Sequence, residues 1–406
     1  MTIRLRRTAP ASWRPSTMRS VRAPEPASSL RSVAPGPRSA LIDHPSPSPP
    51  VCPRVSIIVP IRDEAAGLEA LVADLLSQDY SGLAEILFVD GGSLDGTRER
   101  LGALAVRDAR VRVILNERRG TAAGINLAMS AATGEVVMRV DAHARYRADV
   151  VRVCVEALLR TGAGGVGSIA RPRASAQTLV ARAIVAAHLS PLGIGVAKFR
   201  RAGAEGWAAT AWNGCYWRHV VDQVGPVRED LPRNEDNDFN ARVRALGYGV
   251  WVTSAAHAYY RPRETLGDLW RQYRGNGQGI AMTLFENPAA LGPHHFAPLI
   301  LVSTLATLAA LAPAWSAAAW ALASLLAVYG AALLVATWLA AWRCDGVEER
   351  ESPSWLPLPA LPAALATLHV AYGFGTLEGL LGLGLARARR LLPGRGAVRT
   401  RVEESR

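Results

Sequence analysis

Two short clusters of polar residues in this 406-residue chain have the composition of a reactive site. The first is "VDAH", in which Asp141 and His143 stand one residue apart after an apolar run. A carboxylate and a neutral imidazole both bind divalent metal ions, and such an ion would neutralise phosphate charge. We therefore predict a metal site at Asp141 and His143, with a surface turn as the alternative for His143.

The second cluster, "NEDND", places Glu235, Asp236 and Asp238 ahead of a segment with helical apolar spacing. Acidic residues favour a helix N-terminus because of the helix dipole, so ordinary capping is the simplest interpretation. Two adjacent carboxylates beside a cavity can instead supply a general base.

A third acidic segment, "EILFVDGGSLDGT", carries Asp90 and Asp95 after a buried apolar run. Asp90 could accept hydrogen bonds from a nucleobase or a ribose. Both aspartates could equally cap a turn or a helix, since Asp and Gly favour such positions.

These clusters follow apolar segments that alternate with amphipathic ones between residues 55 and 142. We expect strands at 55–61, 85–90, 111–115 and 135–142, and helices from about 64 to 77, from 95, and from 121 to 132. Such alternation predicts an α/β fold with a parallel sheet covered on both faces. Ligands of these sheets sit outside the carboxyl ends of the strands, which places Asp90, Asp141 and Pro60 along one edge.

Several site classes are excluded by what the motifs lack. No G-x-G-x-x-G follows a strand, and no G-x-x-x-x-G-K-[ST] is present, so dinucleotide and P-loop sites are unsupported. The four cysteines are scattered without a C-x-x-C pair, which implies neither a zinc site nor a disulfide framework.

Five segments in their order and spacing resemble family 2 glycosyltransferases. They are "VSIIVPIRDE", "EILFVDGGSLDGT", "GTAAGINLAMSAATGEVVMRVDAH", "RNEDNDFNARVRALGY" and "RQYRGNG". The chain is similar to the membrane-anchored bacterial branch that builds exopolysaccharide on a lipid carrier, the succinoglycan-type glucosyltransferases. The resemblance covers residues 54–385. It implies a GT-A fold, a Rossmann-like nucleotide-sugar domain at 54–290, followed by C-terminal transmembrane helices at 296–385.

The resemblance also implies which residues bind the nucleotide of a UDP-sugar donor. Pro60, Arg62 and Glu64 match the positions that frame the base and ribose. Asp90 matches the carboxylate that hydrogen-bonds the uracil ring, and Asp95 matches the second acidic position of that loop.

The same resemblance implies the reactive groups. Asp236 matches the catalytic base, with Glu235 beside it, and Asp141 and His143 match the D-x-D metal motif. The base would deprotonate an acceptor hydroxyl, which attacks the anomeric carbon and inverts it. The cofactor would be Mn²⁺ or Mg²⁺, and the imidazole would tolerate Mn²⁺ at least as well as Mg²⁺.

Two motifs depart from the family pattern. The metal motif is D-x-H, which leaves the identity of the metal open. Gln272 and Arg274 occupy the place of the Q-x-x-R-W motif near the diphosphate and the acceptor, but the Trp is absent and the Arg comes one residue early. Processive synthases usually carry the full motif, so the sequence favours addition of a single sugar to a lipid-linked saccharide acceptor.

Three rival functions were considered. A polyprenyl-phosphate glycosyltransferase would use the same donor site on a bare lipid phosphate. A non-enzymatic membrane scaffold is disfavoured by the intact Glu235–Asp236 pair. A nucleic-acid binder is disfavoured because the net charge of +12 arises from residues 1–54 (+7) and 386–406 (+5).

The tails differ in composition from the rest of the chain. Residues 1–53 are rich in Pro, Ser and Arg, and we expect them to be disordered. Residues 386–406 form a second basic tail. Basic tails are suited to anionic lipid, so the charge is interpreted as membrane-directed and not as a sign of nucleic acid.

Residues 296–342 contain no charged side chain, and as a single helix they would be roughly 70 Å long. This is about twice the ~30 Å hydrocarbon core of a bilayer, so two spans with a turn near Pro313 are expected. A third apolar stretch, 357–385, contains His369 and Glu378, and we favour re-entry or an interfacial position over a span. The protein is expected in the inner or plasma membrane of a bacterium, with its catalytic domain cytoplasmic.

Overall fold

A computed structural model of the chain describes residues 52–194, 197–343 and 358–391. The predicted tail at 1–53 lies outside the described residues except for its last two positions. The predicted tail at 386–406 lies outside them from residue 392 onward.

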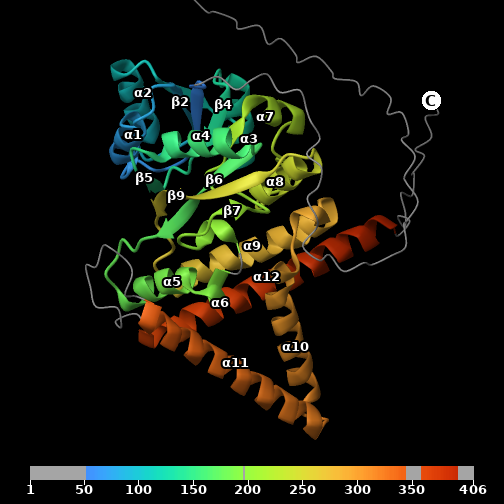
Figure 1. Cartoon of the computed structure of the whole chain (residues 1–406). Coiled ribbons are helices and arrows are strands. Elements are labelled where there is room, and N and C mark those ends of the chain that lie inside the picture. Colours follow the sequence, from blue (N-terminus) through green and yellow to red (C-terminus); the bar gives the residue numbers. More distant parts are fainter. Residues whose placement is uncertain (1–51, 195–196, 344–357, 392–406) are drawn as a thin grey trace, which may run out of the picture. The chain divides into compact units, whose positions relative to one another are not determined.

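The N-terminal half of the α/β domain is a parallel sheet with helices on both faces, as expected (Figure 1). Its strands run in the order β3-β2-β1-β4 and have the bounds β1 (Val55–Ile61), β2 (Leu83–Asp90), β3 (Val111–Leu115) and β4 (Val136–Arg139). The connecting helices are α1 (Leu68–Leu76), α2 (Thr97–Arg107) and α3 (Thr121–Ala131).

Alternation along β1 explains why α1 and α3 cover opposite faces of the sheet. Ile57 packs in the same buried cluster as Leu68 of α1, whereas Ile58 packs with Ile125 of α3. Successive strand residues point to opposite faces, so a strand that is apolar at every position must be covered on both sides.

The sheet continues beyond β4 with mixed strand directions. The order is β4-β8-β6-β9-β5, and β7 pairs with β9. The further strands are β5 (Ala144–Tyr146), β6 (Gly165–Pro172), β7 (Gly206–Trp207), β8 (Cys215–Trp217) and β9 (Val250–Tyr260), and the helices here are α4 (Val150–Thr161), α7 (Arg218–Val224) and α8 (Glu235–Ala245). Because β8 pairs antiparallel with β4, the start of β8 lies beside the end of β4, with Cys215 opposite Met138.

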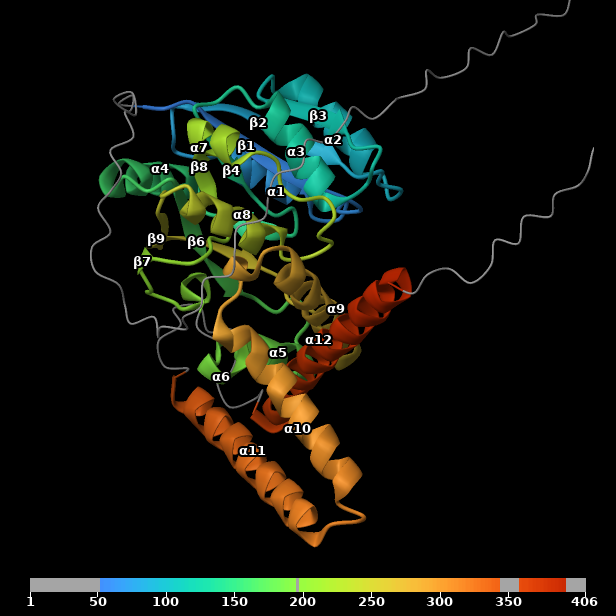
Figure 2. The same ribbon diagram turned by 90° about the vertical axis from the view of Figure 1, so that its right-hand side faces the viewer.

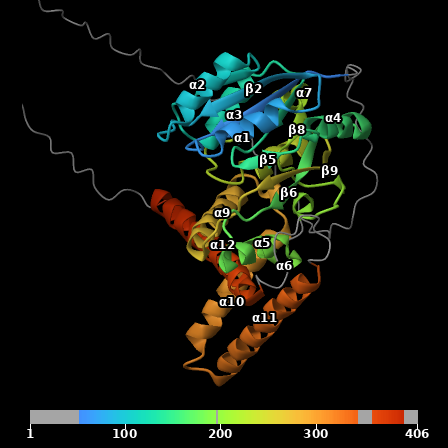
Figure 3. The same cartoon turned by 90° about the vertical axis from the view of Figure 1, so that its left-hand side faces the viewer.

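A layer of helices lies beneath this domain in all three views (Figures 1, 2 and 3). It consists of α5 (Leu179–Leu189), α6 (Pro191–Ile194), α9 (Leu266–Glu286) and α12 (Leu361–Leu391). Glycines bring α9 and α12 into close contact, since a Cβ on Gly277 would lie 2.1 Å from the Tyr372 carbonyl oxygen. The third apolar stretch is therefore a helix that packs on α9.

The remaining helices form an apolar hairpin, α10 (Ala297–Leu311) and α11 (Ser316–Arg343), which the short turns η2 (Pro288–Ala290) and η3 (Pro293–Phe296) join to α9. The break between the helices falls at Pro313, where the sequence predicts it. Two helical segments are long and apolar enough to cross a membrane, Pro293–Leu311 and Ser316–Ala340. In their most apolar 18 residues, 0% and 11% respectively are buried inside the protein. The hairpin extends away from the sheet (Figures 1 and 2), and its exposed apolar side chains include Trp320 and Leu334.

Candidate active site

A cavity of about 1600 Å³ opens at the carboxyl ends of the strands and continues down to the C-terminal helices. Pro60 near the end of β1, and Arg62 and Glu64 just after it, line this cavity. At the far end it is lined by Pro298 of α10 and Tyr372 of α12. One continuous space thus joins the strand-end loops to the apolar helices.

Asp141 is held in place by residues that the sequence analysis did not connect with it. Its carboxylate accepts a hydrogen bond from Trp212 Nε1 at 3.0 Å and lies 3.5 Å from the Arg139 guanidinium. The Tyr146 hydroxyl donates to the Asp141 carbonyl oxygen at 3.0 Å. The indole of Trp212, which also packs against the hydrophobic core, therefore orients Asp141.

His143 is exposed and lines the cavity beside Asp141. The described residues contain no group of three or more His, Cys, Asp or Glu side chains that could hold a metal by themselves. An Asp and a His fit an ion that takes its other ligands from phosphate oxygens and water, as Mg²⁺ and Mn²⁺ do in phosphate sites.

Glu235 and Asp236 begin α8 and line the same cavity. Arg139 lies between them and Asp141, because its guanidinium is 3.3 Å from Glu235 and 3.5 Å from Asp141. Burial, and next the charge of Glu235, raise the pKa of Asp236 to about 6. A carboxylate with a pKa near neutrality is suited to accept a proton and release it again.

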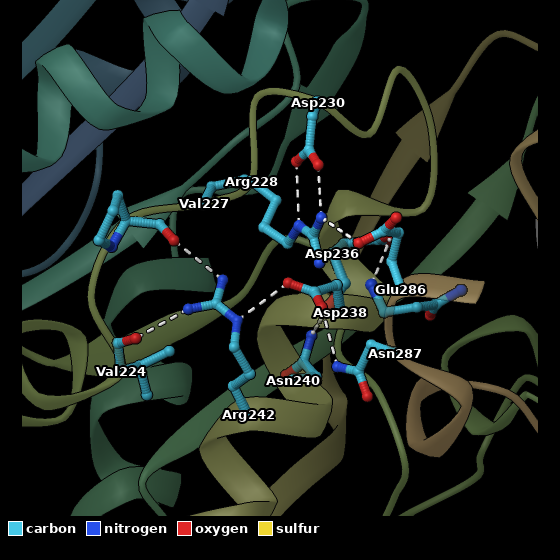
Figure 4. A network of polar contacts seen from close by, with 12 residues as sticks. Val224, Val227, Arg228, Asp230, Asp236, Asp238, Asn240, Arg242, Glu286 and Asn287 are labelled. Atoms are coloured by element: carbon cyan, nitrogen blue, oxygen red, sulfur yellow. Dashed lines mark hydrogen bonds and ion pairs between the residues drawn. The ribbon is translucent and has the colours of Figure 1, made fainter. Parts of the chain in front are cut away.

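The third acid of "NEDND" holds α8 in position instead of entering the cavity. Asp238 is 1% exposed and accepts hydrogen bonds from Arg242 at 2.9 Å and Asn287 at 2.8 Å (Figure 4). Arg228 adds a contact to Glu286, the last residue of α9. These contacts tie the start of α8, which carries Glu235 and Asp236, to the end of α9.

Asp90 does not line the cavity, although its neighbours Val89 and Gly91 do. It is fully buried, and its carboxylate accepts from the Ser93 hydroxyl at 2.5 Å and Arg98 Nε at 3.0 Å. Burial alone would raise the pKa of Asp90, but the hydrogen bonds from Ser93 and Arg98 outweigh it and lower that pKa.

Asp95 also organises the loop. Its carboxylate accepts hydrogen bonds from the Ala65 amide at 2.9 Å and from the Thr97 amide and hydroxyl at 3.1 and 2.5 Å. It joins the loop after β1 to the start of α2, which is the capping alternative considered from the sequence.

Gln272 and Arg274 lie on different faces of α9. Gln272 lines the cavity, and its Oε1 is buried without a hydrogen-bond partner among the described residues. Arg274 is not brought to the cavity; its guanidinium pairs with Glu378 of α12 through Nε at 2.8 Å and Nη2 at 2.5 Å. Residues two positions apart on an α-helix point about 200° away from each other. Since Gln272 and Arg274 have this spacing, the shortened motif cannot present both side chains to one site.

The cavity wall is strongly basic, which the sequence analysis missed. Ten basic and five acidic side chains line it. The basic residues are Arg62, Arg118, Arg119, Arg139, Lys198, Arg200, Arg201, Arg233, Arg244 and Arg263. Such an excess attracts an anionic ligand.

Comparisons with known proteins agree with this geometry. Residues 56–207 match the family described as Glycosyl transferase family 2. The chain is 30% identical over 334 residues to the succinoglycan biosynthesis protein ExoA of Rhizobium meliloti, covering 80% of this chain and 94% of that protein. It is 31% identical over 164 residues to the undecaprenyl-phosphate 4-deoxy-4-formamido-L-arabinose transferase of Aeromonas hydrophila, covering 36% of this chain and 49% of that protein.

Among solved structures, the mannosyltransferase PcManGT of Pyrobaculum calidifontis, in complex with GDP-Man and Mn²⁺, has the same fold. The TM-score is 0.53 at 23% identity, over 80% of this chain and 89% of that one. With the GT-A-like fold, the family match and the nearly full-length relative taken together, this chain is an enzyme that belongs to glycosyl transferase family 2.

Proposed function

We propose that the enzyme transfers one sugar from a UDP-sugar to a hydroxyl group of a lipid-linked saccharide, with inversion, in cell-surface polysaccharide synthesis. The observation that carries the proposal is the placement of Glu235 and Asp236 in one cavity with Asp141 and His143, with Arg139 between the pairs. The name of the Rhizobium relative supports polysaccharide synthesis as the process.

In this proposal Asp236 removes the proton of the acceptor hydroxyl as its oxygen attacks the anomeric carbon. The new bond forms on the face opposite the diphosphate, and the bond between that carbon and the UDP oxygen breaks. General-base catalysis of this kind contributes about 10²–10⁴ in rate. No covalent bond to the enzyme is required.

Departure of UDP leaves negative charge that the basic wall can stabilise. Arg139 holds Glu235 and Asp141 in fixed positions, and preorganised charges of this kind need no reorganisation during the reaction. Asp141 and His143 would hold a divalent ion that supplies further positive charge at the diphosphate. The Mn²⁺ bound by the mannosyltransferase of the same fold supports this assignment.

At the nucleotide end, Pro60, Arg62 and Glu64 are proposed to frame the base and the ribose. A direct hydrogen bond from Asp90 to the uracil would require Ser93 or Arg98 to give up its contact. We propose instead that Asp90 and Asp95 keep the loop in the shape that receives the nucleotide.

The membrane is the proposed location of the acceptor, because the cavity reaches α10, α11 and α12. We propose that α10 and α11 cross the inner membrane of a bacterium and that α12 stays with the cytoplasmic catalytic domain. A reporter that fluoresces only in the cytoplasm, fused to the C-terminus, should be bright; a dark fusion with an active periplasmic reporter would show a third span.

A second candidate is transfer to a bare polyprenyl phosphate, which the partial similarity to the Aeromonas transferase favours. A phosphate nucleophile is already ionised near neutral pH and needs no base, so the two reactions respond differently to Asp236→Asn. A panel of labelled UDP-sugars, offered with polyprenyl phosphate or with lipid diphosphate saccharides, separates them. Transfer to the saccharide that the substitution abolishes supports the proposal, and transfer to the phosphate that survives it contradicts the proposal.

A further inference from the structure

Two arginines of the cavity wall have positive charges that no carboxylate contacts directly, although Glu235 acts on Arg233, and Glu64 and Asp268 act on Arg263, through space. Arg233, just before α8, donates to the neutral Asn276 side chain at 2.7 Å. Arg263, between β9 and α9, is exposed in the same cavity. Neither forms an ion pair with a carboxylate among the residues that the structure describes. By comparison, Arg118 of the same wall is paired with Glu229 at 2.6 Å.

The two guanidinium groups also interact unfavourably with each other. Burial, and next the charge of Arg263, lower the pKa of Arg233. Like charges brought together without a counterion cost free energy unless an anion joins them. The position is therefore one at which the binding of an anion would remove an existing repulsion.

A neutral group beside the arginines also lacks a partner. Gln272 Oε1, one turn before Asn276 on α9, is buried without a hydrogen-bond donor among the described residues. A buried polar atom without a partner costs about 1–3 kcal/mol. A hydroxyl group of a ligand would satisfy this acceptor, so the pocket presents charge for an anion and an acceptor for a hydroxyl.

The location of Arg233 distinguishes it from the nucleotide end. Pro60 near the end of β1 and Gly91 after β2 line that end, whereas Arg233 comes just before α8 and packs against Gly275 and Gly279 of α9. The next wall residues toward the hairpin are apolar or aromatic and belong to α10 and α12: Pro298, Leu301, Leu368 and Tyr372. Arg233 therefore lies between the catalytic end of the cavity and these apolar helices, and Arg263 acts on Arg233 from the same cavity wall.

We propose that Arg233 and Arg263 bind the diphosphate of the acceptor's lipid carrier. This inference rests on the proposed function, and it identifies the anion that Arg233 and Arg263 bind. Arg233 precedes Asp236 by three residues, a distance of at most about 10 Å along the chain. A carrier phosphate at Arg233 and a reacting hydroxyl at Asp236 are thus joined by a short saccharide, and Gln272 accepts from one of its hydroxyl groups.

Binding of farnesyl diphosphate to the full-length protein in detergent micelles tests the proposal without any knowledge of the sugars. Calorimetric titrations are made with farnesyl diphosphate, inorganic pyrophosphate, farnesol and UDP. The variants are Arg233→Gln and the exposed Arg263→Gln, and each keeps a long polar side chain. Arg271→Gln is the matched control, since Arg271 lies on the same helix but is bound to Asp268 outside the cavity.

The expected result is a loss of farnesyl diphosphate affinity of ~10-fold or more in either cavity variant, since hydrogen bonds to charged groups are strong. UDP affinity should stay within ~3-fold of the parent, and Arg271→Gln should match the parent for every ligand. Unchanged farnesyl diphosphate affinity would overturn the proposal. A parallel loss of UDP affinity would also overturn it, because the arginines would then hold the donor. Pyrophosphate binding as tight as that of farnesyl diphosphate would exclude a lipid ligand.

Failure of the proposed function has a different signature. If the parent enzyme transfers no sugar to any lipid saccharide, the proposed reaction is wrong whatever the titrations give. If transfer is observed but the arginine variants bind farnesyl diphosphate normally, only the assignment of the arginines is wrong.

Discussion

Asp90 and Asp95, at the end of β2 and in the loop after it, and Glu235 and Asp236, at the start of α8, are two acidic pairs in different environments. Asp90 and Asp95 have their oxygens satisfied by amides, hydroxyls and Arg98, and the pKa of Asp90 is lowered. Asp236 is half-buried next to Glu235, and its pKa is raised to about 6. A carboxylate with all its partners supports structure, whereas one held in an unfavourable position can take part in chemistry.

Removing the negative charge of Asp236 should have the largest effect on sugar transfer. Asp236→Asn should lower transfer by about 10²–10⁴, because the proton acceptor is lost, while UDP affinity changes little. Rates from single turnovers and UDP titrations measure the two quantities separately. Turnover within tenfold of the parent would remove Asp236 from the role of base.

The same substitution should not destabilise the fold. Because the pKa of Asp236 is raised in the folded state, its ionised form opposes folding once the pH rises through about 6. Asp236→Asn should therefore raise the melting temperature at neutral pH, with a gain that shrinks as the pH falls toward the ordinary value. A lower melting temperature at neutral pH would show that the carboxylate is well satisfied after all.

The metal site should respond to its supporting indole as well as to its ligands. Asp141→Ala should abolish Mn²⁺ binding, and His143→Ala should weaken it. Trp212→Phe should weaken it ~10-fold, since partners that orient a ligand contribute about 10–100-fold to metal affinity. Electron paramagnetic resonance of Mn²⁺ measures binding without the reaction. Full activity in excess EDTA would contradict the metal assignment.

Asp90→Asn should show the opposite behaviour to Asp236→Asn. Replacing the charge that Ser93 and Arg98 contact should reduce stability by about 1–3 kcal/mol, with turnover of the folded enzyme nearly unchanged. Because the pKa of Asp90 is lowered, its stabilisation is present above the ordinary pKa and is lost as the pH falls below it. Chemical unfolding at two pH values tests this. A large loss of UDP affinity with unchanged stability would instead favour direct binding of the uracil by Asp90.

Glu378→Gln should have the smallest effect. Glu378 and Arg274 are 38% and 43% exposed, and ion pairs of this kind contribute about 0–1 kcal/mol. Thermal unfolding in detergent measures the change. A loss of transfer without a change in stability would place Arg274 in the reaction and contradict its assignment to the contact between α9 and α12.

The sequence predicts those elements that depend only on the spacing of apolar and turn residues within a short segment. The strands β1 to β4, the break between α10 and α11 and the start of α8 all lie where apolar spacing and turn residues place them. Local pattern also brings Asp141 to the strand ends, because the fold class puts ligands there.

Partners that are distant in the chain could not be predicted in this way. Trp212 reaches Asp141 only because β8 pairs with β4. Arg274 was expected near the diphosphate, but the helical rotation that separates it from Gln272 turns it toward Glu378. The arginines of the cavity are scattered from residue 62 to residue 263 in a segment of balanced charge, so only the folded chain shows that they gather.

The pH dependence of transfer tests the central claim most directly. If Asp236 acts as the base with a pKa of about 6, the rate of the parent enzyme should fall with decreasing pH through that value, since only the ionised carboxylate accepts a proton. The residual activity of Asp236→Asn should lack this acidic limb. A rate of the parent that stays constant between about pH 5 and pH 8, or a limb that persists in Asp236→Asn, would contradict the account.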